Sequence, residues 1–186
     1  MTAANVFYFG TTPNGEKVEL VRLDNGQISC EIITFGATLR TLWIRDRDDR
    51  PVDVVLGYDT LDQYCSEGGY FGATVGRVAN RIAGGSFELN GTTYTLPTND
   101  DRNHLHGGIA GFSHRVWEIE EVDDHSVTLC LNSLHGEEGY PGNVRISTKY
   151  LLHDNALEIQ HCAVPDADTL CSLTNHSYFN LSGHNS

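Results

Sequence analysis

Short runs of β-branched and aromatic residues recur along almost the whole chain, and Gly, Asn or Asp residues bound most of them. This spacing constrains the fold more than any other feature, because such runs between turn signals are typical of antiparallel β structure. The runs cover residues 17–23, 28–35, 38–44, 86–89, 92–96, 116–122, 126–131, 144–152 and 156–164. The sequence therefore predicts an all-β protein, built as an antiparallel sandwich or an open barrel.

Several joints between these runs carry residues that accept a positive φ at little cost. Residues 24–26, 90–91 and 154–155 are Asp-Asn-Gly, Asn-Gly and Asp-Asn, respectively. These residue types favour hairpin turns. No long segment has the apolar spacing of an amphipathic helix, and the acidic segment 60–64 is the one helical candidate of note. The charged cluster at 45–51 is interpreted as a solvated hairpin tip.

Composition and charge limit the classes of partner. The chain has 186 residues, of which 39% are hydrophobic and 20% charged, as in a globular protein. Its formal net charge of -13 repels nucleic acid phosphates and anionic lipid surfaces. A neutral small molecule such as a sugar fits this charge better, and no linker or repeat indicates a second domain.

The location of the protein is predicted from its N-terminus, its apolar runs and its cysteines. Residues 1–9 lack the basic start and long apolar core of a signal peptide, and no stretch approaches the ~20 apolar residues of a membrane span. Five cysteines form no C-x-x-C pair and lie scattered among strand-like runs, which indicates reduced, buried thiols. The sequence therefore predicts a cytoplasmic protein.

The segment 76–85 is the first that suggests chemistry. It places Arg77, Asn80 and Arg81 among flanking glycines. A guanidinium fork beside an amide can bind vicinal hydroxyls of a sugar, although an arginine can equally brace the fold by binding backbone carbonyls. No dinucleotide fingerprint, nucleophile elbow or phosphate-binding loop is found, so acid–base chemistry remains the favoured class.

Two histidines, His104 and His106, stand in alternate positions in the segment 103–108. On an extended strand their side chains would point to the same face, which raises the possibility of a metal site. Two ligands do not make such a site, and Ala110, Gly111 and Phe112 occupy the positions where a further glutamate ligand is expected. We interpret His104 as structural and His106 as a substrate contact, and we expect neither a metal nor a cofactor.

The segment 173–181 combines a histidine, His176, with amide, hydroxyl and aromatic side chains. Histidine exchanges a proton near neutral pH, and Tyr178 and Phe179 offer aromatic faces to the apolar side of a pyranose. A buried core histidine is the alternative. Only a few residues follow this segment, and they predict no strand that would close a sheet.

The segment 136–142 carries two carboxylates, Glu137 and Glu138, between glycines and a proline. Its composition favours an exposed turn over a functional loop.

Taken in order, the motifs GRVANRIAGG, NHLHGG, GEEGYPG and LTNHSYFNLSG make the chain similar to the aldose 1-epimerase family, also called galactose mutarotase. The resemblance runs from about Asn25 to the last residues, and includes residues 34–37 and 54–58. It implies a large antiparallel β-sandwich whose open face binds a hexose, with residues 1–186 as the N-terminal part of one such domain.

The resemblance also implies roles for individual residues. Asn80, Arg81 and His106 match substrate-binding positions, and Tyr178 is added to this set for its aromatic face. His176 matches the general acid that protonates the ring oxygen, while a base removes the proton of the C1 hydroxyl. The ring then opens, C1–C2 rotates, and reclosure inverts the anomeric centre without a cofactor.

The chain departs from the family in its length. The family's general base, a glutamate, and a further substrate-binding aspartate follow the NHSYFN motif, and both fall beyond residue 186. The sequence thus predicts a sandwich that is incomplete at its C-terminus. It leaves open two functions: an epimerase of glucose or galactose, or an inactive carbohydrate-binding fragment. It does not separate these two sugars, and does not determine the oligomeric state.

Overall fold

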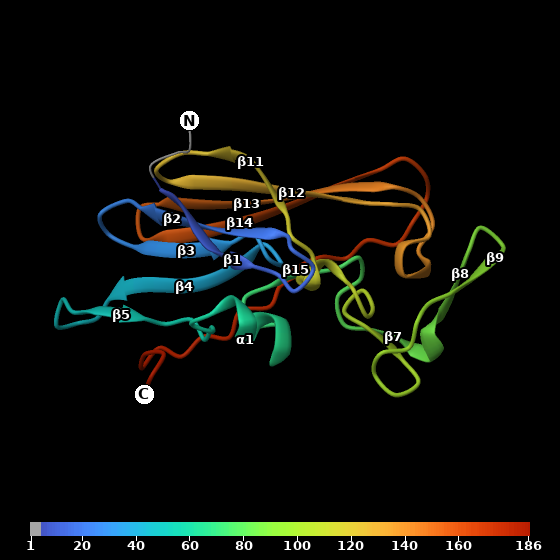
Figure 1. The fold of residues 1–186 in the computed structure, drawn as a ribbon, viewed down its shortest axis with the longest axis horizontal. Coiled ribbons are helices and arrows are strands. Elements are labelled where there is room, and N and C mark those ends of the chain that lie inside the picture. Colours follow the sequence, from blue (N-terminus) through green and yellow to red (C-terminus); the bar gives the residue numbers. More distant parts are fainter. Residues whose placement is uncertain (1–4) are drawn as a thin grey trace.

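Two antiparallel sheets form the main body of the protein, which a computed structural model describes for residues 5–186 (Figure 1). The first sheet has the order β1-β2-β3-β4-β5, and the second has the order β11-β12-β13-β14. The strands are β1 (Val6–Thr11), β2 (Lys17–Asp24), β3 (Ser29–Ile33), β4 (Thr38–Arg45), β5 (Pro51–Asp53), β11 (Glu118–Val122), β12 (Ser126–Ser133), β13 (Val144–His153) and β14 (Ala156–Pro165).

The hydrophobic core lies between these two sheets. Val21 and Ile32 project from the first sheet, and Leu129 and Ile146 from the second, all with no exposed surface. Tyr150 is fully buried among them and donates its hydroxyl proton to the Ala37 carbonyl at 2.6 Å. The alternation of buried and exposed residues along β13 follows from the period of two in a strand, because one face meets the core. An all-β sandwich is therefore confirmed.

The sequence predicted the long strands well. Each predicted run overlaps an observed strand, and the predicted turns at 90–91 and 154–155 contain the positive φ values expected there, including 52° at Asn90 and 50° at Asp154. The cluster at 45–51 lies at the β4–β5 hairpin, and residues 46–50 are exposed, as predicted. The prediction missed β1 and β5.

The predicted helix is confirmed as α1 (Leu61–Ser66). Thr60 caps it, and the side chains of Thr60 and Gln63 form a reciprocal capping box. Its buried residues, Leu61 and Tyr64, pack on the outer face of the first sheet in a second, smaller cluster with Val18 and Leu20. This helix is too short to cross a membrane, and no other helix of residues 5–186 is long and apolar enough to do so.

Between and after the long strands, the chain forms short elements at one end of the sandwich. These are β6 (Thr74–Val75), β7 (Arg81–Ile82), β8 (Ser86–Leu89), β9 (Thr92–Thr95), β10 (His104–Leu105), β15 (Thr174–Asn175), and the 3-10 turns η1 (Ala83–Gly85), η2 (Phe112–His114) and η3 (Glu137–Gly139). β6 pairs with β15, β7 with β10, and β8 with β9. Figure 1 shows that the β8–β9 hairpin projects away from the sandwich.

The last residues are more closely integrated than the sequence predicted. The Asn180 and His184 amides donate to the Val54 and Asp53 carbonyls at 2.9 and 2.7 Å, so the C-terminal segment lies along the end of the first sheet. Residues 182–186 form no strand, as predicted, although the His184 amide bonds to the last residue of β5. Within residues 5–186, β14 pairs with β13 alone. Of the segment 1–9 used to predict localisation, residues 1–4 lie outside the described part.

The cysteine prediction was correct in part. All five thiols are free, as expected, and Cys30 and Cys130 are buried. Cys162 and Cys171 are exposed, contrary to the prediction, because Cys162 points to the open face of β14 and Cys171 lies in the extended segment that follows it.

Candidate active site

Two short ladders bring distant segments together. Thr174 and Asn175 pair with Val75 and Thr74, and the ladder continues where the His176 amide donates to the Ala73 carbonyl at 2.8 Å. In the second ladder, Leu105 pairs with Arg81.

Directly beyond this second ladder, His106 and Asn80 are joined twice. The His106 amide donates to the Asn80 carbonyl at 3.0 Å, and the Asn80 amide donates to Nδ1 of His106 at 3.0 Å. Both residues have a positive φ, of 63° at Asn80 and 53° at His106, so the backbone turns out of the ladder here.

Aromatic contacts join the two ladders into one site. The His106 and His176 rings lie 5.0 Å apart between centroids, in an edge-to-face arrangement. Tyr70 contacts both rings, at 4.8 Å from His106 and 5.7 Å from His176, and Tyr178 lies 5.1 Å from His176 on another side. The structure thus brings together the predicted residues His106, His176 and Tyr178.

The geometry determines which nitrogen of His106 can donate. A backbone N–H can only donate, so Nδ1 of His106 must accept, and the neutral ring carries its proton on Nε2. Burial lowers the pKa of His106, and the nearby His176 and Arg81 lower it further, while Asp100 opposes them. His106 is therefore a neutral hydrogen-bond donor at pH 7.

Arg81 completes the polar side of the site. Its Nε donates to Asp100 at 2.6 Å, and its Nη1 lies 3.4 Å from Oδ1 of Asn80. This ion pair raises the pKa of Arg81 and lowers that of Asp100. Because Asp100 occupies the Nε side of the guanidinium, the Nη groups of this exposed side chain remain available for a ligand.

The second arginine of the same motif has a different role. Arg77 is only 2% exposed, and its guanidinium donates to the carbonyls of Ser133, Leu134 and Pro141 at 3.1, 2.9 and 2.7 Å. The two alternatives raised by the sequence therefore apply to different residues. Arg77 braces the fold, and Arg81 faces the site.

His104 is a structural residue, as predicted from the sequence. It has no exposed surface, its Nδ1 donates to the Pro97 carbonyl at 2.7 Å, and its Nε2 lies 2.7 Å from the Tyr140 hydroxyl. The prediction that His104 and His106 share one strand face was wrong, because the strand ends at Leu105 and His106 takes a positive φ. Within residues 5–186, no group of three or more potential ligands is placed to hold a metal ion.

The segment 136–142 was predicted to be an exposed turn, and this prediction was wrong. Tyr140 and Pro141 are buried: the hydroxyl of Tyr140 binds His104, and the carbonyl of Pro141 accepts a hydrogen bond from Arg77. The carboxylate of Glu138 accepts the amides of Ile109 and Ala110 at 3.0 and 2.9 Å.

Glu137 binds Arg115 and the Ser133 hydroxyl. Glu138 thus holds the loop that follows His106, and both carboxylates have structural partners.

Two residues of the site, Tyr70 and Asp100, were not predicted from the sequence. Burial and the nearby Asp100 raise the pKa of Tyr70, so its hydroxyl stays protonated. Tyr70 stands among three glycines at 68–72, which is a visible signal for an aromatic side chain on an unusual turn. Asp100 sits in the polar turn 98–103, and nothing distinguishes it there from an ordinary turn residue.

Comparison with known proteins identifies the family. A family model described as aldose 1-epimerase matches residues 19–186, a range that contains all the site residues named above. The chain belongs to the aldose 1-epimerase family. The resemblance inferred from the ordered motifs is thus confirmed.

Relatives within this family cover nearly all of the chain. Galactose mutarotase of Bos taurus is 44% identical over 179 residues, which are 96% of this chain and 52% of the relative. Aldose 1-epimerase of Haemophilus influenzae is 40% identical, over 91% of this chain and 49% of its own length. The chain spans about half the length of the curated relatives it matches.

Solved structures agree with the fold. The aldose epimerase homologue of C. elegans superimposes with a TM-score of 0.85 at 36% identity, over 88% of this chain and 51% of the other. Galactose 1-epimerase of Lactobacillus acidophilus gives a TM-score of 0.82 at 30% identity, over 95% and 53%. The predicted galactose mutarotase-like sandwich is therefore confirmed.

Proposed function

We propose that the protein interconverts the α and β anomers of a neutral hexose, such as galactose or glucose. One observation supports this proposal above all: His106, His176 and the Asn80–Arg81 pair come from three separate segments and converge beside Tyr70 and Tyr178. This combination of a proton donor, a guanidinium and aromatic faces suits a pyranose. The names of the relatives point to the same substrate class.

In this proposal each residue has a distinct task. Arg81 and Asn80 bind hydroxyls of the sugar, and Nε2–H of His106 donates to a sugar oxygen. Because His106 is kept neutral, the acid role falls to His176, which protonates the ring oxygen as the C1–O5 bond breaks. Tyr178 and Tyr70 pack against the apolar face of the ring.

The reaction also needs a base for the proton of the C1 hydroxyl. Asp100 is poorly suited, because its bond to Arg81 lowers its pKa. Glu137 and Glu138 are held by structural partners. We therefore infer that the base is a carboxylate beyond residue 186, in the part of the family domain that this chain does not span.

We also propose that the hexose carries no phosphate and that the reaction takes place in the cytoplasm. The net charge of -13 disfavours an anionic substrate, and five free thiols suit a reducing compartment.

The test is the rate of α-D-galactose mutarotation, followed by polarimetry. The 186-residue chain is compared with a version extended by the second half of a family domain, and we expect activity in the extended version. There, His176→Asn should lower kcat by ~10², as for the loss of a general acid.

The matched control is His153→Asn, at an exposed histidine on the β13–β14 hairpin. This variant should keep full activity. An unchanged kcat in His176→Asn would remove His176 from the mechanism.

A further inference from the structure

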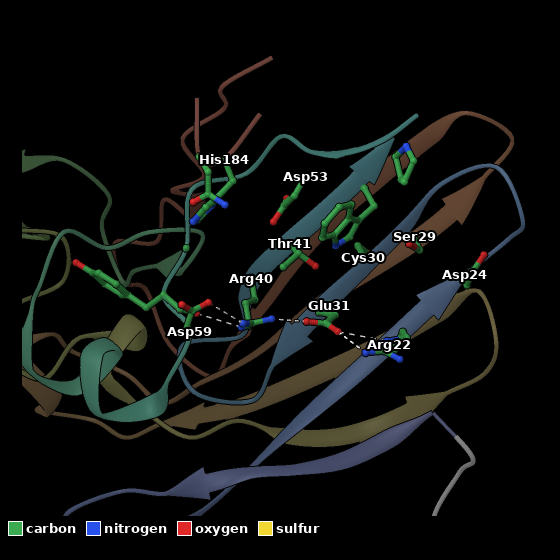
Figure 2. A pocket seen from close by; sticks show the side chains of 15 residues that line it. Arg22, Asp24, Ser29, Cys30, Glu31, Arg40, Thr41, Asp53, Asp59 and His184 are labelled. Atoms are coloured by element: carbon green, nitrogen blue, oxygen red, sulfur yellow. Dashed lines mark hydrogen bonds and ion pairs between the residues drawn. The ribbon is translucent and has the colours of Figure 1, made fainter. Parts of the chain in front are cut away.

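A large open hollow lies on the outer face of the first sheet, apart from the candidate active site (Figure 2). Its volume is about 600 Å³. Helix α1 covers one part of this face with Leu61 and Tyr64. The remaining part, formed by the central residues of β2 to β5, is left open and becomes the floor of the hollow.

The floor consists of two cross-strand rows. In one row, Arg22 of β2 pairs with Glu31 of β3, which pairs with Thr41 of β4. In the next row, Ser29 of β3 pairs with Trp43 of β4. Residues two apart on a strand face the same way, so both rows present their side chains to the hollow.

The walls come from segments that are distant in sequence. Tyr58 and Asp59, which follow β5, border the floor, and so does His184 near the C-terminus. Nδ1 of His184 donates to the Val55 carbonyl at 2.9 Å, which fixes the C-terminal segment as a wall. In Figure 2, Asp59 and His184 both lie to the left of Arg40 and Thr41, with His184 above Asp59.

The charges of the floor are paired with one another. Glu31 accepts from Arg22 Nη2 at 2.7 Å and from Arg40 Nη1 at 2.5 Å. Nη2 of Arg40 lies 3.5 Å from Asp59, and its Nε donates to the Tyr58 carbonyl at 3.1 Å. The arginines are neutralised and further carboxylates lie nearby, so the hollow does not favour an anion. Because it also contains two guanidiniums, it does not favour a metal cation either.

Two groups in the hollow lack a partner of their own. Oγ1 of Thr41 is buried and makes no hydrogen bond within residues 5–186. An unsatisfied buried hydroxyl is unusual in a folded protein. Trp43 is 41% exposed, although burying the large apolar surface of an aromatic side chain is strongly favourable. A ligand that offers both hydroxyls and an apolar face would satisfy the two groups together.

We propose that this hollow is a second saccharide-binding site, which takes a neutral mono- or disaccharide. The indole of Trp43 packs against the apolar face of the sugar, and the fixed Arg40–Glu31 network and Thr41 bind its hydroxyls. Its volume is within the usual range of roughly 300–1,000 Å³ for small-molecule sites.

An aromatic wall separates the hollow from the candidate active site. Tyr58 contacts Phe71 at 5.2 Å, and Phe71 contacts Tyr178 at 5.2 Å. Tyr58 faces the hollow, whereas Tyr178 belongs to the candidate active site. A sugar in the hollow is therefore a separate ligand, and its binding does not depend on catalysis.

The tryptophans provide a direct test. The chain has two, and Trp117 is only 2% exposed, so acrylamide should quench Trp43 selectively. We would titrate the Arg81→Ala variant of the 186-residue chain with D-galactose and, separately, with maltose, while recording quenching. We expect at least one of the two sugars, at millimolar concentration, to protect Trp43 from quenching by acrylamide. Trp43→Phe, which keeps Trp117, should show no such change.

A second variant tests the assignment of the hydroxyl. Thr41→Val keeps the shape of the side chain but removes Oγ1. It should lower the affinity for the sugar by about fivefold or more, and leave the Tm unchanged or higher. Arg47→Ala, on the exposed hairpin tip, is the matched control and should bind as the unchanged chain does.

Two results would overturn the proposal: no protection of Trp43 by either sugar in Arg81→Ala, or equal affinity in Thr41→Val. Protection without any mutarotation in the extended protein would instead contradict the proposed function alone.

Discussion

The sandwich and the site-bearing end of the molecule are built in different ways. In the sandwich, strands of up to ten residues form long ladders, such as the ten continuous pairs of β13 with β14. At the other end, the strands that carry the site are two residues long, and Tyr70, Asn80, His106 and Glu138 all have positive φ. Regular pairing builds the scaffold, and the functional side chains lie where it ends.

The two regions also satisfy their backbone groups differently. The sandwich uses main-chain ladders, whereas side chains take over at the site. Asn99, for example, accepts the Leu105 amide and donates to the carbonyls of Leu105 and Gly108. Such a region depends on a few polar side chains, so single substitutions there should have effects as large as those in the core.

Arg77→Met should produce the largest loss of stability. It leaves three carbonyls, two of them in buried hydrogen bonds, without their donor, and at about 1–3 kcal/mol for each unsatisfied group we expect a loss of about 4 kcal/mol in the free energy of unfolding. Urea denaturation measures it.

The control is Arg81→Met, an exposed arginine in the same motif. It should leave the free energy of unfolding close to that of the unchanged chain, because exposed ion pairs contribute little. Similar losses in both variants would contradict the separate roles of the two arginines.

Ile146→Ala tests the sandwich. Ile146 has no exposed surface, and truncation of such a side chain costs about 2–5 kcal/mol, so we expect about 3 kcal/mol. In hydrogen exchange, β12 and β13 should lose protection while binding of sugar at the site persists under native conditions. Loss of sugar binding with intact protection of β12 would show that the two regions are not distinct in this way.

Gly107→Ala tests the turn that places His106. Gly107 has a φ of 84°, and an added Cβ would lie 1.8 Å from the carbonyl oxygen of Gly76. The loop must shift, and we expect a loss of about 2 kcal/mol together with impaired sugar binding. Gly91→Ala, at a φ of 75° with open space around it, should cost only the strain of about 1 kcal/mol.

The smallest effect concerns two histidines, one in each region. Burial lowers the pKa of both His106 and His161, but the charge of His176 lowers that of His106 alone. In His176→Gln, NMR titration should show the pKa of His106 rising towards its ordinary value of 6.5, while His161 is unchanged. An unmoved His106 would mean that burial alone sets its pKa.

The same shifts give the sign of the pH dependence of stability. Because folding lowers both pKa values, the unfolded chain takes up protons first as the pH falls. The stability associated with these histidines is present above about pH 6.5 and is lost as the pH falls through 6.5 towards the folded values. Urea denaturation between pH 7.5 and pH 5 checks this direction.

Much of the fold was predictable, since each long strand has a period of two and most have a turn signal on either side. The weak predictions concern short elements. β7 and β10 consist of two residues each, too few to show any period. Their pairing depends on the Asn80–His106 bonds, which join residues 26 positions apart. The exposed turn predicted at 136–142 failed because turn composition does not reveal that Tyr140 is buried against His104.

The sequence alone determined the sandwich, the family and the set of polar residues in the motifs. These depend on local spacing and on residue types, which are visible without coordinates. Tertiary structure alone decided which of two arginines is buried, and that Tyr70 and Asp100 join the site. It also placed Trp43 and Thr41 in one hollow. These outcomes depend on which segments meet in space, and residues distant in sequence carry no local signal of that contact.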